Sequence, residues 1–506
     1  MDFSRFECLS FDCYGTLIDW ESGIASALRP VLETHDIQAS RDSLLELYGE
    51  AEAEVERGPY RPYREGDGTL DGVGQSSPRP LGVRSDPSDR GHVRPDGSRH
   101  ALRCGDDRGH RHERHSVMTE QMGETDHFYY RLQPEGVYID SQRDNKAFGY
   151  ADGKILLSED NGKSWPHSAV FPNARNITFS LILRNGNVLF ATRAKLYLGT
   201  DDLQTVQQIT VKDADGSDYI PHTPVDPELP GWYFHTIPGI NSWDVNGTEM
   251  VVWGNYCNVL GGASPVNIYY STDNGRTVKI AYAFGQNPYN HDDGSNGGGT
   301  SGTSLGNPDN PVICRHVHTV AYSPAEDAFY ACTGDQDKPE GFECHWLRGT
   351  YDADGDRWAW EVVVSDHLNS RYKAGGISFV DGELYWISDS NGPEPYDRGI
   401  FKCAPEDLTR PEKHTLLFNP EVESGNLIIQ DGVFLASHCA PASPMATGII
   451  VSLDGGETWA QHDLAELGQR SPTRFHEKNS EGWFRMDLRS GWVAHAEVLF
   501  LKPKDG

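Results

Sequence analysis

From about residue 126 onward, short apolar segments alternate with turns rich in Gly, Asn, Asp and Pro, at intervals of roughly 8–12 residues. The segment LILRNGNVLFATRAKLYLGTDD (181–202) predicts a hairpin that turns at Asn185-Gly186, followed by a further strand. Strands this short and this evenly spaced are typical of all-β domains. The pattern therefore predicts that residues 126–506 form one all-β domain.

A longer unit recurs within this region, with an irregular period of roughly 40 to 80 residues. Each unit contains a strand that ends in small or polar residues, a loop, and a strand that enters an Asp-rich turn, as in ELYWISDSNG (383–392). Four short strands per unit and about seven units predict a seven-bladed β-propeller. We expect the last unit, near 482–503, to close the ring with a strand from around 127–132.

The first part of the chain has a different pattern. Residues 1–64 predict a short buried strand followed by two helices, over 20–37 and 40–58. Residues 65–125 are expected to be a disordered linker, because 65–117 contain no Phe, Trp or Tyr and show no periodicity. The abrupt change of composition also fits translation out of frame, with Met118 as a second natural start.

Composition and charge narrow the functional classes. The chain has 506 residues and a net charge of -31, which disfavours nucleic acid as a partner. A site for an acidic ligand must therefore be locally basic.

Nine scattered cysteines indicate free thiols in a reducing compartment. No apolar run reaches the roughly 18–20 residues of a membrane span, and the N-terminus lacks a signal-peptide pattern. As written, the sequence predicts a soluble cytoplasmic protein without a membrane partner; a start at Met118 leaves the compartment open.

Three turns in the β region share the pattern Ser-x-Asp-x-Gly-x-(Ser/Thr)-(Trp/Val). They are SEDNGKSW (158–165), STDNGRTV (271–278) and SLDGGETW (452–459), with TYDADGDRW (350–358) as a degenerate fourth copy. The pattern resembles the Asp-box, or BNR repeat, of sialidase-like propellers. In a tight hairpin an Asp accepts backbone N–H bonds and a Gly supplies a permissive conformation. We expect structural roles for Asp160, Asp273 and Asp454, with Trp165 and Trp459 packed between blades.

This resemblance also orients the propeller. Asp-boxes lie between the third and fourth strands of a blade, and the family places ligands at the opposite face. That face gathers the starts of the innermost strands and the loops between second and third strands. The residues expected there are predominantly basic or polar. The substrate-binding candidates are Arg175, Arg193, His235, Asn255, Arg371, Lys373 and His438, and Asp335 and Asn391 fall on the same face.

The densest group of such residues is CRHVHTVAYSP (314–324), where His316 and His318 share a face at the start of an inner strand. The sialidase pattern is poorly met, because FHTIPG (234–239) has no Arg where that family's Arg-Ile-Pro element requires one. β-Elimination from a uronic acid sugar needs a group that neutralises the carboxylate, a base and an acid. The candidate catalytic residues at this exposed rim are Tyr256, Arg315, His316 and His318.

In fold and residue types, the region resembles the seven-bladed ulvan-lyase and rhamnose–glucuronate propellers. The resemblance implies a polysaccharide lyase whose partner is an acidic carbohydrate. A sialidase-like glycoside hydrolase and a non-catalytic glycan-binding propeller remain alternatives. A structural zinc or calcium ion also remains open. Cys332, Cys344 and His345 could join His316 or His318 around zinc, but the spacing matches no known zinc signature and favours free thiols.

Near the N-terminus, FDCYGTLID (11–19) resembles the first motif of haloacid dehalogenase-like hydrolases. The resemblance implies that Asp12 is a nucleophile at the end of a strand and that Thr16 assists it. Tyr14 replaces the second Asp of phosphatases, as in the 2-haloacid dehalogenase branch. The motif covers only residues 1–64, and the linker supplies none of the later strands that complete such a site. We expect an inactive remnant, with 2-haloacid dehalogenase activity through Asp12 as a second alternative.

Overall fold

The structure is a computed structural model of the 506-residue chain. It describes residues 122–133, 136–192, 195–213, 215–219, 234, 236, 238–256, 266–285, 306–334, 344–389, 398–420, 424–438, 447–468, 470–489 and 497–504. The dehalogenase-like segment with Asp12, and nearly all of the expected linker, lie outside the described residues.

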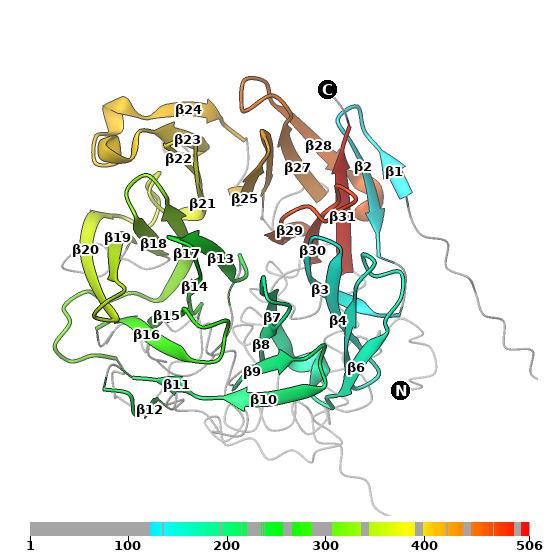
Figure 1. Ribbon diagram of the computed structural model, residues 1–506. Helices are drawn as coiled ribbons and strands as arrows, with labels where there is room; N and C mark the ends of the chain where they lie inside the picture. The colour runs from blue at the N-terminus through cyan, green and yellow to red at the C-terminus, as the bar shows by residue number, and fades with distance from the viewer. Residues whose placement is uncertain are drawn as a thin grey trace, which may run out of the picture. The chain divides into compact units, whose positions relative to one another are not determined.

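The described strands form seven antiparallel sheets arranged as the blades of a propeller (Figure 1). Blade 1 contains β3 (Tyr138–Arg143), β4 (Lys146–Ala151), β5 (Lys154–Ser158) and β6 (His167–Val170). Blade 2 contains β7 (Ile177–Ile182), β8 (Val188–Thr192), β9 (Lys195–Thr200) and β10 (Thr205–Ile209). Blade 3 contains β13 (Asn241–Val245), β14 (Thr248–Gly254), β15 (Asn267–Ser271) and β16 (Val278–Ala283), extended outward by β11 (Val211–Lys212) and β12 (Asp218–Tyr219).

Blade 4 contains β17 (His316–Ser323), β18 (Ala328–Gly334), β19 (Cys344–Asp352) and β20 (Arg357–Asp366). Blade 5 contains β21 (Ala374–Val380), β22 (Glu383–Ser388), β23 (Ile400–Cys403) and β24 (Thr415–Phe418). Blade 6 contains β25 (Ser424–Gln430), β26 (Val433–His438), β27 (Thr447–Ser452) and β28 (Ala460–Leu464). Blade 7 contains β29 (Ser471–His476), β30 (Phe484–Arg489), β31 (Glu497–Pro503), β2 (Phe128–Leu132) and β1 (Met122–Glu124). The prediction of an all-β, seven-bladed propeller is confirmed.

The ring closes by pairing the two ends of the described chain. Strand β2 pairs antiparallel with β31, with Phe128 opposite Pro503 and Leu132 opposite Leu499. The predicted closing strand is therefore confirmed. Closure pairs backbone groups that two separate sheet edges would otherwise expose. It also buries Phe128 in the core of blade 7.

Apolar side chains fill the space between neighbouring blades. Trp253 of blade 3 packs edge-on against Phe179 of blade 2, with ring centroids 5.9 Å apart. Trp386 of blade 5 makes a similar contact with Trp346 of blade 4, also at 5.9 Å. These side chains expose 2 % or less of their surface. Because apolar burial scales with area, such aromatic pairs supply much of the adhesion between blades.

The Asp-rich turns adopt the predicted structure; we call the turns at 158–165, 271–278 and 452–459 the Asp turns. In each, the carboxylate accepts the backbone N–H four residues later, at 2.8 Å from Ser164, 2.9 Å from Thr277 and 2.9 Å from Thr458. The glycines at 162, 275 and 456 have positive φ angles of 83°, 79° and 92°. The predicted structural geometry is confirmed, and each Asp turn joins a third strand to a fourth.

The tryptophans of two Asp turns pack between blades, as expected. Trp459 stacks on Phe418 of blade 5 with ring centroids 5.6 Å apart. Trp165 packs with Ile139 against Val498 and Phe500 of blade 7. Each turn therefore fastens its own blade to the preceding one.

The innermost strands share an irregularity near their starts. Six of the seven strands next to the axis shift register within the described chain, and β13 pairs regularly. The shifts fall at Asp140 in β3, Thr178 in β7, His318 in β17 and Arg474 in β29, among others. A bulge re-aims the side chain of the extra residue. Several buried polar residues occupy these positions, so bulges direct them out of the regular alternation.

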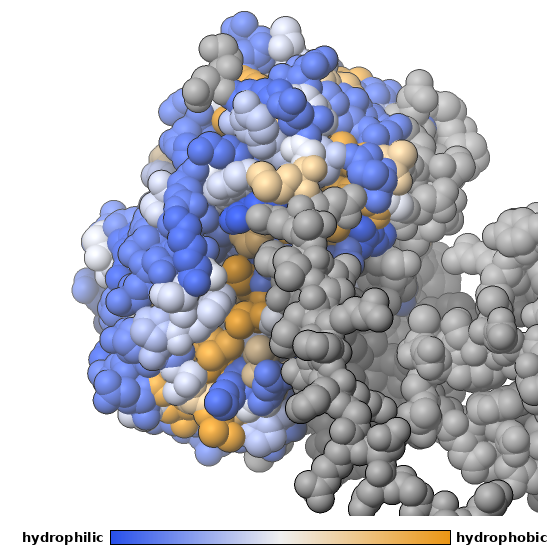
Figure 2. Space-filling model, turned by 90° about the vertical axis from the view of Figure 1, so that its right-hand side faces the viewer, coloured by the Kyte–Doolittle hydropathy of each residue, from blue (hydrophilic) through white to orange (hydrophobic). Residues whose placement is uncertain are grey.

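In the view of Figure 2, the surface drawn in colour is mostly hydrophilic, with an apolar band. Met122, Tyr129 and Val170 are the exposed large hydrophobic residues on β1, β2 and β6. Within the described residues, no helix has the length and apolar character needed to cross a membrane.

Candidate functional site

The predicted catalytic residues lie at the face opposite to the Asp turns. Tyr256 follows the end of β14, the second strand of blade 3, whereas His316 opens β17, the innermost strand of blade 4. In an antiparallel blade the start of the first strand and the end of the second lie at one edge, and His316 is accordingly paired with Gly334. The Asp turns follow third strands and therefore lie at the other edge.

The aromatic rings of three predicted catalytic residues form a contiguous stack. The ring of Tyr256 lies on the imidazole of His316, with centroids 3.6 Å apart and planes inclined by 17°. The His318 ring is 5.1 Å from His316 and 5.7 Å from Tyr256. The structure thus brings together residues that the sequence placed on two separate segments.

These rings are not on an exposed rim, as the sequence suggested. Tyr256 exposes 3 % of its surface, His316 0 % and His318 4 %. The expectation of exposure was wrong, because the rings pack across the interface between blades 3 and 4 and cover one another. Burial lowers the local dielectric constant, so charges that form among these groups interact more strongly than at a surface.

Two charged residues lie beside these rings: Lys373, just before β21, and Asp389, just after β22. The Asp389 carboxylate lies 3.5 Å from Nδ1 of His318 and 3.6 Å from Nζ of Lys373. Lys373 is 2 % exposed, whereas the side chain of Asp389 retains 18 %. We call Tyr256, His316, His318, Lys373 and Asp389 the mouth cluster. Its order is phenol, two imidazoles, a carboxylate and an ammonium group.

Asp389 was missed by the sequence analysis, although a signal for it was present. It is the first residue after β22, the second strand of blade 5. Asn255 occupies the same position after β14, and that residue was selected. The sequence analysis selected residues from the loops between second and third strands. Applied to every blade, this criterion would also have selected Asp389. Asn391, which was selected in the same loop, lies outside the described residues.

Asn255 has a structural role beside the cluster. It is fully buried, and its Oδ1 accepts the backbone N–H of Asn267 at 2.7 Å. Its own backbone carbonyl accepts the N–H of Val317 at 3.2 Å. Asn255 therefore ties blade 3 to blade 4 and positions the adjacent Tyr256. Arg315 precedes His316 and is half-buried.

Other predicted binding residues are not brought to the cluster. Arg371 donates to the carbonyl of Pro411 at 3.2 Å, and its guanidinium lies 5.1 Å from the centre of the Phe401 ring. A planar guanidinium favours such stacking, which directs Arg371 along blade 5. Arg175 is exposed in a short 3-10 turn, Ala174–Asn176, before β7. Arg193, His235 and Asp335 lie outside the described residues, as does the side chain of His438.

Two cysteines lie next to the cluster. Ala374 donates its backbone N–H to Sγ of Cys332 at 3.3 Å. Burial disfavours the Cys332 thiolate, but a hydrogen bond from Cys344 and the charge of His318 outweigh it, so the pKa of the Cys332 thiol is lowered. The same hydrogen bond, together with burial, raises the pKa of Cys344. Both cysteines are free thiols, as predicted.

The side chains of the zinc alternative, Cys332, Cys344 and His345 with His316 or His318, are not spaced to share a metal ion. Among the described residues, the group with metal-like spacing is instead Glu159, His167 and Asp202 at the edge of blades 1 and 2. Lys146 lies 2.9 Å from Glu159 and already supplies positive charge there.

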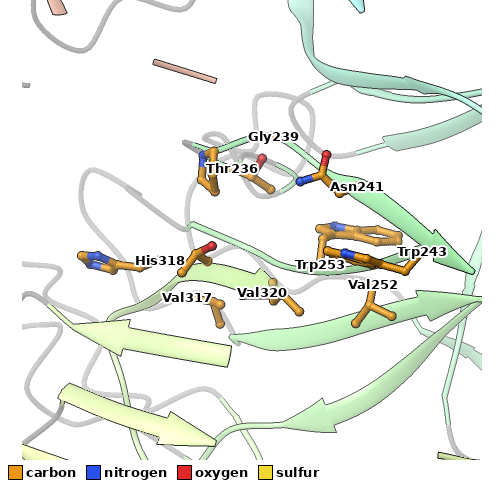
Figure 3. Close-up of a pocket in the computed structure, with 12 residues that line it drawn as sticks. Thr236, Gly239, Asn241, Trp243, Val252, Trp253, Val317, His318 and Val320 are labelled. Carbon is orange, nitrogen blue, oxygen red and sulfur yellow. The ribbon is translucent and has the colours of Figure 1, made fainter. Parts of the chain in front are cut away.

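A small pocket of about 20 Å³ lies behind β17, between blades 3 and 4. Thr236, Asn241 and Trp253 line it, and the His318 ring points away from Trp253 (Figure 3). A volume of this size holds one water and no sugar ring.

Comparisons with known proteins identify no family. No protein-family model matches the chain, and neither does any curated protein. A computationally designed protein, Ika8, matches with 10% identity and a TM-score of 0.38 over 75% of this chain and 94% of its own. An ancestral GH74 enzyme matches with 13% identity and a TM-score of 0.43 over 75% of this chain and 49% of its own. BamB from Moraxella catarrhalis matches with 10% identity and a TM-score of 0.34 over 72% of this chain and 84% of its own. At these values the likeness supports no function, and the fold assignment rests on the strand pairing.

Proposed function

We propose that this chain is a carbohydrate-active enzyme that acts at the mouth of the propeller, as a polysaccharide lyase on a glycan that contains uronic acid. The observation that carries the proposal is the mouth cluster itself. It places a phenol and two imidazoles in contact, with the His318 imidazole 3.5 Å from a carboxylate. A reaction with two proton transfers needs a general base and a general acid, and a phenol and two imidazoles are groups that can fill these roles.

β-Elimination proceeds by a defined set of bond changes. A base removes the proton on the carbon next to the uronate carboxylate. The bond between the neighbouring carbon and the glycosidic oxygen then breaks, and its electron pair leaves with the oxygen. A carbon–carbon double bond remains in the uronate ring, and an acid supplies a proton to the departing oxygen. No oxidant, metal or water is consumed.

The residues divide these tasks according to their positions. Tyr256 and His316 are the paired proton carriers for the carbon acid and the leaving oxygen. His318 is held by Asp389 and supports Tyr256 and His316 in handling protons. Arg315 is half-buried beside His316, and its bidentate guanidinium suits a uronate carboxylate. This local positive charge is needed because the chain as a whole carries -31.

The test is a panel of uronic-acid polysaccharides incubated with the whole chain, in which the ultraviolet absorbance of unsaturated uronate is followed. We expect new absorbance on at least one member, and Arg315→Lys should raise KM on that glycan because the bidentate contact is lost. A panel of neutral polysaccharides is the matched control. Reducing ends without unsaturation would replace the lyase with a hydrolase. Binding without cleavage would leave a glycan-binding propeller.

A further inference from the structure

Two histidine side chains meet beside the strand that closes the ring. His127 lies directly before β2, the closing strand of blade 7, and His462 lies in β28, the outermost strand of blade 6. Nδ1 of His127 and Nε2 of His462 form a hydrogen bond of 2.9 Å, and the ring centroids are 4.9 Å apart. Both strands lie in the upper right of Figure 1. The contact therefore joins blade 6 to the closing strand of blade 7.

The surroundings hold both rings in place. The backbone N–H of His127 donates to Oγ1 of Thr125 at 3.2 Å, and the His127 carbonyl accepts the N–H of Lys504 at 2.8 Å. The His462 ring meets the ring of Phe128 edge-on, with centroids 5.1 Å apart, and Phe128 belongs to the core of blade 7. Both imidazoles are half-buried. The pair is thus packed against the core and still accessible to protons from solvent.

Two histidines in contact can take up one proton and keep their hydrogen bond, but not two. In the neutral pair, one ring donates and the other accepts. After the first proton, the imidazolium donates to the ring that is still neutral. After the second proton, both rings carry only donors, and their like charges repel each other. The contact then changes from an attraction to a repulsion.

The charged groups around the pair offset this repulsion only in part. Asp126 and Asp463 each adjoin one histidine of the pair, and both are exposed. Their negative charges favour the protonated form of His462. Lys504 adds a positive charge on the neighbouring strand, and its ammonium group is paired with Glu124 at 2.9 Å.

The pKa of His462 moves in the direction that this arrangement requires. Burial, and after it the charge of His127, lower the pKa of His462 and outweigh the two carboxylates. Ile449, opposite His462 in β27, adds no charge. A histidine in an unfolded chain has a pKa of about 6.5. The stability that the pair contributes is therefore fully present above about pH 6.5 and is lost as pH falls through the lowered pKa.

From this geometry we infer that the pair His127–His462 is an acid-sensitive latch between blades 6 and 7. At neutral pH the latch holds β2 against β28. When both rings carry a proton, the latch opens, and the outer edge of the interface between the two blades opens more often. Such local opening needs no unfolding of the whole propeller. The inference goes beyond the proposed lyase activity and does not depend on it.

Hydrogen exchange of the whole chain, followed by mass spectrometry at about pH 7.5 and about pH 5, tests the latch, since histidine changes its charge in this range. The rates are corrected for intrinsic exchange at each pH. We expect the protection of β2 and β28 to fall by roughly fivefold at the lower pH, the effect of two unit charges about 4 Å apart in water. High salt should reduce this loss, because the pair is partly exposed.

Two variants remove the titrating pair. His462→Gln cannot take up the second proton, so β2 and β28 should keep nearly the same protection at both pH values. His127→Gln should give the same result and serves as an independent second variant. His414→Gln is the matched control. It removes another histidine whose pKa burial lowers, in blade 5, and should leave the acid response of β2 and β28 intact.

The outcomes separate a latch from a general weakening in acid. A loss of protection that is confined to β2 and β28 in the parent and absent from both latch variants supports the latch, whether or not the chain cleaves any glycan. Unchanged protection of these strands in the parent at about pH 5 would overturn the inference. An equal loss in the parent and both latch variants, or a loss of the same size in every blade, would also overturn it.

Discussion

The ring of Tyr256 lies on the imidazole of His316 with centroids 3.6 Å apart, although the two residues belong to neighbouring blades. The contact is buried, and β14 and β17 approach each other directly beneath it. Any movement between blades 3 and 4 must therefore change the distance between the two groups. The stack makes the blade interface part of the site.

Tyr256→Phe should lower turnover on a uronate glycan by about 10²–10⁴-fold, because it deletes one proton carrier. The ring and its stacking on His316 are kept, so the unfolding temperature should stay close to that of the parent. Steady-state kinetics and thermal unfolding measure the two effects. Tyr322→Phe is the control, since Tyr322 bonds to Asp327 at 2.7 Å near the other end of β17 and should leave turnover unchanged. Full activity of Tyr256→Phe would remove Tyr256 from the mechanism.

Asp389→Asn should lower turnover on a uronate glycan, because it removes the carboxylate that lies 3.5 Å from Nδ1 of His318 and 3.6 Å from Nζ of Lys373. Asp389→Glu keeps the charge and should restore part of the turnover. Steady-state kinetics and thermal unfolding measure turnover and folding stability. A loss of folding stability that accounts for the lost turnover in both variants would instead indicate that Asp389 only maintains the structure.

Asp273→Ala should lower the free energy of unfolding by roughly 1–3 kcal/mol, because it leaves backbone donors of the turn without an acceptor. The Thr277 N–H loses its bond of 2.9 Å. Turnover at the opposite face should be unchanged. Asp354→Ala, in the degenerate turn, is the control and should be nearly neutral in chemical denaturation. Selective loss of activity in a stable Asp273→Ala protein would contradict the structural role.

The Asp turns should also contribute to stability in acid. Hydrogen bonds from Ser164 lower the pKa of Asp160 to about 2, and bonds from Thr458 do the same for Asp454. An unfolded Asp has a pKa of about 3.9, so this contribution is present above about pH 4 and is lost as pH falls toward about 2. The double variant Asp160→Asn/Asp454→Asn should show a flatter stability profile between these values. An unchanged slope in acid denaturation would argue against a contribution from these carboxylates.

A chain that starts at Met118 should retain the unfolding transition of the parent, because every described strand lies at or after Met122. A chain that starts after Gln133 lacks β1 and β2 and leaves the edge of β31 unpaired. We expect that second truncation to unfold at a much lower temperature. Calorimetry of both proteins tests the domain boundary. Failure of the Met118 chain to fold would show that the boundary is misplaced.

The sequence by itself determined the architecture of this protein. Short apolar segments, turn residues and the three Asp turns are local signals, and each depends on a few neighbouring residues. They predicted the seven blades, the closing strand and the positive φ angles of Gly162, Gly275 and Gly456. The edge on which the candidate residues lie followed from the same antiparallel pairing.

Only the tertiary structure decided which side chains meet at that edge. Asp389 reaches His318 across the boundary of blades 4 and 5, whereas Arg371 packs on Phe401 instead. The bulge at His318 and the burial of Tyr256 were equally invisible in the sequence. These features arise where strands far apart in the chain are pressed together, and a bulge of one residue changes the direction of a side chain without altering the alternation on which sequence analysis depends.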